Sequence, residues 1–262
     1  MIETIALTTN DGAETGARVA GKTGPALIFV HGVGSSAAIW DTQLSAFGDT
    51  NRCYAIELRG NGVPKPEPDP SLITRDGFAR DVLAVADAAG IDTFTIVGCS
   101  LGGVVAFELW KSVPQRINAM VLVGTFAQYP DGQVYADGIK AAVRTAGDMD
   151  HFAQQRAAKL GLPPERLRET VEQMARKTVP SYIASTQATW TGDYRAVLPA
   201  IDVPSLVACG EHDLVAPLAL SQTIANAIPD ARLTVIEGAG HVSNADQPER
   251  FNALLRAFLA SV

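Results

Sequence analysis

Short apolar runs that alternate with helical segments are the feature of this chain that most restricts its fold. Residues 26–30 and 94–97 are apolar on both faces, which is typical of strands that helices cover on both sides in a parallel sheet. The second run is followed by a helical pattern over 101–113 that stops before Pro114. Repeated units of this kind predict an α/β fold with a mostly parallel, doubly wound sheet.

The same alternation assigns the other elements of the core. We expect further strands at residues 2–7, 17–20, 53–58, 119–123, 205–209 and 232–236. Further helices are expected at residues 74–89, 217–228 and 248–259. Thr74 is the predicted N-cap of the first of these helices, which Gly90 ends.

The alternation is interrupted between residues 127 and 198. Helical segments such as 166–177 occur there without a convincing buried strand. Long structured insertions in α/β folds tend to lie at the functional end of the strands. We therefore predict a helical cap at 127–198 over a core of 1–126 and 199–262; helices packed on the flank of the sheet are the alternative. A proline-rich segment, 63–70, is expected to form an extended loop.

Composition limits the partners of the chain. With 262 residues and 47% hydrophobic content it can bury a large core, and its net charge of −7 argues against nucleic acid or an anionic membrane as partner. A small-molecule ligand is the better expectation. Three widely spaced cysteines in apolar runs indicate free thiols and a cytoplasmic location, and no apolar run approaches the roughly 20 residues of a membrane span. A homo-oligomer is compatible with the sequence, which leaves the oligomeric state open.

A serine lies between glycines where a predicted strand meets a predicted helix. The stretch Gly98-Cys99-Ser100-Leu101-Gly102 fits the pattern G-x-S-x-G, in which a serine sits at the tip of a sharp, strained turn. A side chain at either flanking glycine would collide with the strand or the helix. This context favours Ser100 as a nucleophile over an ordinary helix N-cap. A turn centred on Cys99 would lack the flanking glycines, so we expect that residue to be a buried packing residue.

A serine nucleophile requires a base and an orienting carboxylate. His241 follows the last predicted strand in a loop of small residues and is the predicted base. Asp213 follows strand 205–209 and is the predicted acid, with Glu211 as the alternative. His212 is interpreted as a loop residue, because a metal site built on it would lack further ligands.

Acyl transfer also requires backbone donors for the developing oxyanion. The amide of Leu101 lies just after the nucleophile, at the start of the helix, where the helix dipole favours negative charge. The second donor is expected in the loop His31-Gly32-Val33-Gly34, through the main chain of Val33. His31 is expected to support this turn by hydrogen bonds.

These motifs resemble the α/β-hydrolase superfamily over essentially the whole chain, including its order of serine, acid and histidine. Within it, the chain is most similar to the 3-oxoadipate enol-lactonase group and related lactonases and carboxylesterases. The suggestive stretches are 40–43, 80–83 and 240–251. The family's usual Asp-x-Arg-Gly-His-Gly reads Glu57-Leu58-Arg59-Gly60-Asn61-Gly62 here, and Cys99 precedes the nucleophile, so enol-lactone specificity does not follow from the resemblance.

The resulting hypothesis is a hydrolase that uses no cofactor and no metal and cleaves a small ester or lactone through an acyl-enzyme. We expect Gly32, Cys99 and Trp190 to contact the substrate. A C–C bond hydrolase of the meta-cleavage type is an alternative, although that group tends to carry tryptophan where this chain has Val242. A hydrolase-like receptor with little turnover is a second alternative. Enzymes with an aspartate nucleophile are excluded by Ser100.

The sequence leaves the lining of the pocket open. An arginine such as Arg59 or Arg144 is a candidate to bind a substrate carboxylate, and nothing in the sequence chooses between them. Apolar candidates, each equally compatible with the core, are Ile39, Trp40, Phe126, Tyr129, Phe152 and Trp190.

Overall fold

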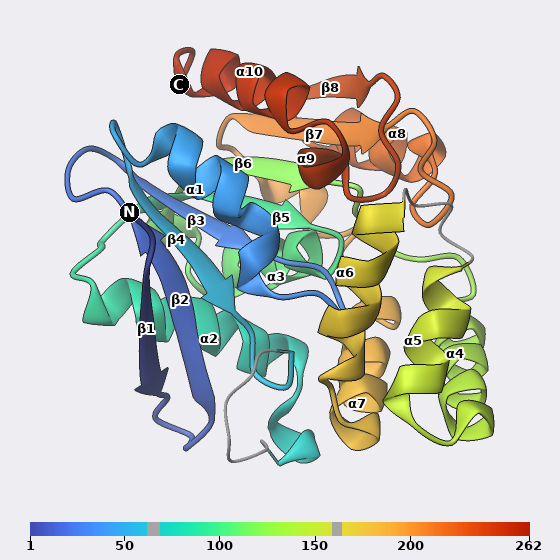
Figure 1. The fold of residues 1–262 in the computed structure, drawn as a ribbon. Helices are drawn as coiled ribbons and strands as arrows, with labels where there is room; N and C mark the ends of the chain where they lie inside the picture. Colours follow the sequence, from blue (N-terminus) through green and yellow to red (C-terminus); the bar gives the residue numbers. More distant parts are fainter. Residues whose placement is uncertain (62–68, 159–163) are drawn as a thin grey trace.

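A single eight-stranded sheet forms the centre of the computed structural model, which describes residues 1–61, 69–158 and 164–262 (Figure 1). The strands are β1 (Glu3–Thr8), β2 (Glu14–Ala20), β3 (Ala26–Val30), β4 (Arg52–Glu57), β5 (Phe94–Cys99), β6 (Ile117–Val123), β7 (Ser205–Gly210) and β8 (Ala231–Ile236). Their spatial order is β1-β2-β4-β3-β5-β6-β7-β8. The pairs β1–β2 and β2–β4 are antiparallel, and every other neighbouring pair is parallel. The predicted fold class is confirmed.

Helices follow most of these strands, as the alternation predicts. They are α1 (Asp41–Phe47), α2 (Arg75–Ala88), α3 (Leu101–Ser112), α4 (Gly132–Ala146), α5 (Met149–Ala157), α6 (Pro164–Ala175), α7 (Val179–Trp190), α8 (Leu218–Ala227), α9 (Ser243–Asp246) and α10 (Pro248–Leu259). The sequence did not predict the short helices α1 and α9. Most of the predicted loop at 63–70 lies outside the described residues.

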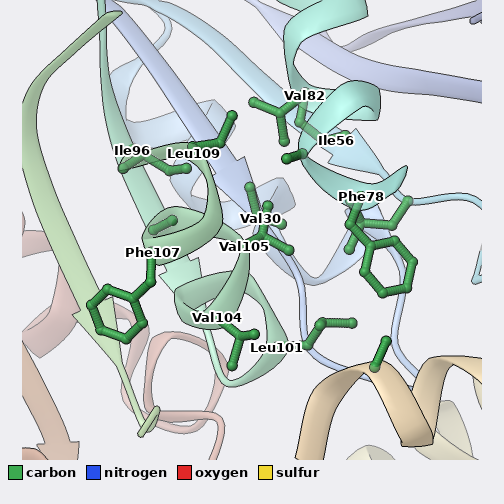
Figure 2. Packing of buried hydrophobic residues seen from close by; sticks show 14 of the residues in the cluster. Val30, Ile56, Phe78, Val82, Ile96, Leu101, Val104, Val105, Phe107 and Leu109 are labelled. Atoms are coloured by element: carbon green, nitrogen blue, oxygen red, sulfur yellow. The ribbon is translucent and has the colours of Figure 1, made fainter. Parts of the chain in front are cut away.

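Two apolar layers hold the sheet between its helices. Along β3, Leu27 and Phe29 pack with side chains of α1 and α10, whereas Ile28 and Val30 pack with those of α2 and α3. Figure 2 shows part of the second layer, where Val30 lies near Val105 of α3. Because consecutive strand residues point to opposite faces, a strand that is apolar throughout serves both layers. This explains the unbroken apolar run at 26–30.

The helices α4 to α7 lie between β6 and β7 in the chain and gather beside one end of the sheet (Figure 1). Residues from all four border a cavity together with the loops that follow β3, β5, β7 and β8. The four helices therefore cover the carboxyl ends of these strands. The division into a core and a cap at 127–198 remains a prediction about domain organisation. No helix in the described parts of the chain is long and apolar enough to cross a membrane.

Candidate active site

Ser100 occupies a strained turn between β5 and α3. Its φ is +54° and its ψ is −113°, a conformation that residues with a side chain rarely adopt. The backbone around it is held on two sides: its amide donates to the carbonyl of Val123 at 2.9 Å, and its carbonyl accepts from the hydroxyl of Thr125 at 2.7 Å. Hydrogen bonds to the end of β6 and to the residues just after it thus stabilise the strained backbone conformation of Ser100.

The glycines around Ser100 are required by the close approach of backbone on both sides. A Cβ on Gly98 would lie 2.3 Å from the carbonyl oxygen of Gly102, and a Cβ on Gly102 would lie 2.1 Å from that of Val30. Neither distance is compatible with a side chain. The steric reason proposed from the G-x-S-x-G pattern therefore agrees with the packing of this turn.

His241 and Asp213 meet beside this turn. The Nδ1 atom of His241 lies 3.0 and 2.9 Å from the two carboxylate oxygens of Asp213. The Asp213 carboxylate is fully buried and also accepts hydrogen bonds from the amides of Val215 and Ala216, at 2.9 and 2.8 Å. The loop after β7 therefore fixes the carboxylate, and the carboxylate orients the imidazole.

The other acid and histidine of this loop have different positions. The Glu211 side chain is half exposed and accepts a hydrogen bond from the amide of Gly238 at 3.0 Å. His212 is largely exposed at the edge of the cavity. The geometry thus favours Asp213 over Glu211 as the partner of His241. The described residues contain no group of His, Cys, Asp and Glu arranged to hold a metal ion.

Gly124 lies against the paired side chains and was not identified from the sequence. Its φ is +51°, and a Cβ at this position would lie 2.8 Å from the carbonyl oxygen of His241 and 3.0 Å from Oδ2 of Asp213. Only glycine leaves room for the pair here. The sequence signal is a glycine that directly follows an apolar strand, at Val123-Gly124.

Most of the predicted site residues border one cavity of about 290 Å³; Asp213 and Leu101 do not. Ser100 and His241 both border it, and Asp213 lies behind His241. Val33, Gly32, Cys99 and Trp190 border it as well. Burial raises the pKa of the Cys99 thiol well above its ordinary value, which disfavours a thiolate next to Ser100.

The two predicted oxyanion donors, Val33 and Leu101, are neighbours of residues that lie at the cavity, Gly32 and Ser100. Gly32 lies close to the nucleophile, since a Cβ there would be 3.3 Å from Cβ of Ser100. Val33 is the next residue in the chain and also borders the cavity. Among the described residues, no acceptor takes a hydrogen bond from the amides of Val33 or Leu101. Unpaired amides beside a nucleophile are what an oxyanion site requires.

His31 supports the loop that carries Val33. It is fully buried; its Nδ1 lies 2.8 Å from the carbonyl oxygen of Gly32, and its Nε2 accepts from the amide of Leu58 at 3.2 Å. These contacts agree with the supporting role expected for it. His31 does not border the cavity, whereas His241 does and has the buried Asp213 carboxylate as its partner.

Neither arginine proposed from the sequence lies in the cavity. Arg59 is fully buried in ion pairs with Asp81 and Asp11, at 2.8 and 2.7 Å. Its role in the described structure is to join β4 to α2 and to the turn after β1. Arg144 is exposed on α4 and does not border the cavity.

The apolar candidates divide between the cavity and the core. Trp190 and Ile39 border the cavity, whereas Trp40 is fully buried between Phe29 and Phe251. Phe126 stacks on Trp190, at 5.1 Å between ring centroids. Cavity residues that the sequence did not identify come mainly from α4 to α7 and include Tyr135, Arg156, Arg166, Glu169, Met174 and Tyr182.

Comparison with known proteins establishes the class. Residues 25–248 match the family model of the alpha/beta hydrolase fold, and the chain belongs to this family. It is 29% identical to 3-oxoadipate enol-lactonase 2 of Acinetobacter baylyi, over 90% of this chain and 88% of the relative. A protein of Azorhizobium caulinodans, provisionally named carbamate hydrolase RutD, is 26% identical over 91% of this chain and 92% of its own length.

Solved structures show the same similarity in three dimensions. A hydrolase from Pseudomonas aeruginosa PA01 matches with a TM-score of 0.89 and 30% identity, and the match covers 98% of each chain. The enol-lactonase from Burkholderia xenovorans LB400 matches with a TM-score of 0.87 and 26% identity, over 98% of this chain and 100% of that one. The resemblance to the enol-lactonase group is thus confirmed at the level of family and relatives.

Proposed function

We propose that this protein is a serine hydrolase that cleaves a small ester or lactone through an acyl-enzyme. The observation that carries the proposal is one cavity that both the strained Ser100 and the Asp213-oriented His241 border. A hydrolase family with an enol-lactonase among its relatives supports the same class of reaction.

The proposed roles follow from the geometry. Ser100 attacks the substrate carbonyl, and His241 takes its proton through Nε2, since Nδ1 faces Asp213. The same histidine then gives the proton to the leaving oxygen, and water releases the acid by the reverse sequence. The amides of Val33 and Leu101 hold the oxyanion, each contributing about 3 to 4 kcal/mol by analogy with measured cases.

A carbamate is a second candidate substrate, because several relatives, from different bacteria, carry a carbamate hydrolase name. The carbonyl of a carbamate is attacked by the same nucleophile and stabilised by the same donors. Ester, lactone and carbamate cleavage would therefore share Ser100 and differ only in how the cavity receives the rest of the substrate.

Substitution of Ser100 tests the proposal. We expect S100A to lower kcat/KM for esters, lactones or carbamates by about 10⁴-fold or more, because the nucleophile is lost. The matched control is S112A, which removes an exposed hydroxyl at the other end of α3. A fluorophosphonate should label the wild-type protein with 1:1 stoichiometry at Ser100 and leave S100A unlabelled.

Two outcomes would contradict the proposal. Unchanged turnover by S100A would exclude Ser100 as nucleophile. The absence of both labelling and turnover for the whole substrate panel, including C–C substrates, would favour the receptor alternative.

A further inference from the structure

The segment 57–61, which departs from the usual motif at its first and last residues, lies against the loop that carries Val33. The amide of Leu58 donates to Nε2 of His31 at 3.2 Å. On the other side of the ring, Nδ1 of His31 lies 2.8 Å from the carbonyl oxygen of Gly32 and donates to it, since a carbonyl only accepts. This carbonyl and the amide of Val33 belong to one planar, trans peptide, so fixing the first orients the second.

Asn61 holds the next peptide of this loop and connects it to α7. Its Oδ1 accepts from the amide of Gly34 at 3.3 Å, and its Nδ2 donates to the carbonyl of Arg59 at 3.2 Å and to the hydroxyl of Ser185 at 3.3 Å. Asn61 is 1% exposed and Ser185 is fully buried, so bulk water does not compete for these bonds. The loop is thus held on both sides of Val33.

The helices α6 and α7 also pack directly on this loop. Gly34 has a φ of +76°, and a Cβ there would lie 3.1 Å from Cε2 of Tyr182 and 3.2 Å from Cε of Met174. The hydroxyl of Ser35 donates to Oε1 of Gln173 at 3.2 Å, in a partly buried hydrogen bond. The position of the loop therefore depends on the helices over the sheet as well as on the core.

The asparagine explains one departure from the usual motif, which has histidine at this position. A neutral imidazole has one donor and one acceptor nitrogen, whereas the Asn61 amide accepts one hydrogen bond and donates two. A histidine here would leave at least one of the groups that Asn61 contacts without this partner. Asn61 and Ser185 are therefore a matched pair in this chain.

We propose that Asn61 is a positioning residue for the oxyanion site, and that it couples the Val33 amide to the packing of α7 through Ser185. This inference rests on the proposed acyl transfer. Asn61 does not border the cavity, so it acts through the loop and not on the substrate. Because the oxyanion develops only in the transition state, a displaced donor lowers kcat and leaves substrate binding largely intact.

Substitutions at both ends of the Asn61–Ser185 hydrogen bond test this inference. With 4-nitrophenyl butyrate as the probe, we expect N61A to lower kcat by about 10- to 100-fold and to change KM by less than about threefold. S185A should lower kcat by about 3- to 10-fold, because it removes one hydrogen bond. The pH profile of kcat should keep its shape in both variants, since neither touches His241 or its acid.

The matched control is T186V, at the neighbouring residue of α7. It removes a buried hydroxyl that has no hydrogen-bond partner among the described residues, and valine has nearly the same shape. T186V should keep the kcat and KM of the wild type.

Hydrogen exchange of the loop separates this inference from the proposed reaction. Measured by mass spectrometry, the backbone amides of residues 31–37 should exchange about 10-fold faster in N61A, and detectably faster in S185A, than in the wild type and T186V. If the wild type hydrolyses no ester, the proposed function fails, and the exchange rates alone decide the role of Asn61.

Three results would overturn the inference: wild-type exchange of the loop in N61A, an unchanged kcat of N61A in an active enzyme, or a loss confined to KM. If N61A lacks the native circular dichroism spectrum, S185A decides by the same measurements. Exchange and kcat equal to those of T186V would then overturn the inference.

Discussion

At the scale of single residues, the site depends on where a side chain is present and where it is absent. Ser100 keeps a strained conformation because Val123 and Thr125 hold its backbone. Gly124, between those two residues, leaves the space in which Asp213 and His241 meet. The same short segment after β6 therefore supports both the proposed nucleophile and its proposed base.

This arrangement predicts that G124A impairs catalysis. A methyl group at Gly124 would press on the His241 carbonyl and the Asp213 carboxylate and would be strained at φ +51°. We expect kcat to fall by about 100-fold, because displacements of 1 Å at a catalytic group have effects of this size. Steady-state kinetics should show the loss in kcat more than in KM.

The control is G138A, at a position of α4 where an added Cβ would have no neighbour within 4 Å. It should keep the wild-type activity and gain up to about 1 kcal/mol of stability, since alanine is the better helix former. Wild-type kinetics for G124A would show that the space at Gly124 does not position the pair.

At the scale of elements, local signals in the sequence agree with the helix boundaries of the core. The hydroxyl oxygen of Thr74 accepts a hydrogen bond from the amide of Gly77 at 2.9 Å, at the start of α2. This is the N-cap that the sequence predicts. Helix α3 ends at Ser112, two residues before Pro114. The boundaries were predictable because caps and proline act within a few residues.

The cap of α2 gives a test of stability. T74A should lower the free energy of unfolding by about 1 kcal/mol, because it leaves an amide of the first turn without its acceptor. T74S keeps a hydroxyl and should retain most of the stability. Urea unfolding followed by circular dichroism measures both, and equal midpoints for T74A and the wild type would contradict the prediction.

At the scale of the whole molecule, one buried charge lies in the segment between α6 and α7. Lys177 is 6% exposed, and burial lowers its pKa from 10.5 to about 8, although the Glu57 carboxylate at the end of β4 partly opposes this shift. The helices over the sheet and the core thus interact through charge as well as through apolar packing. Folding at neutral pH requires the ammonium group to lose much of its hydration.

The lowered pKa predicts how stability depends on pH. Between pH 8 and pH 10.5 the unfolded chain binds the Lys177 proton and the folded chain has released it, so the contribution of Lys177 to stability rises with pH in this range. K177M removes the titrating group. The free energy of unfolding of the wild type should therefore rise relative to that of K177M between pH 7 and pH 10.5, by on the order of 2 to 3 kcal/mol.

Urea unfolding of the wild type and K177M at pH 7 and pH 10.5 measures this difference in the free energy of unfolding. The contributions of the other titrating groups are the same in both proteins and cancel. K22M, at an exposed lysine of the loop before β3, is the matched control and should show no such change relative to the wild type. A constant difference between the wild type and K177M would contradict the prediction.

The sequence alone determined the α/β class, most core elements, the glycine-lined serine turn and the choice of Ser100, Asp213 and His241 as candidates. These features follow from local rules: apolar periodicity, helix caps, and glycines where backbone approaches backbone. The tertiary structure decided which side chains share the cavity. It placed Arg59 in buried ion pairs and Arg156 at the cavity, and it positioned Gly124 against the histidine and its acid. An arginine in an ion pair and an arginine without one look alike in a sequence, because the difference lies in partners that are distant along the chain and close only after folding.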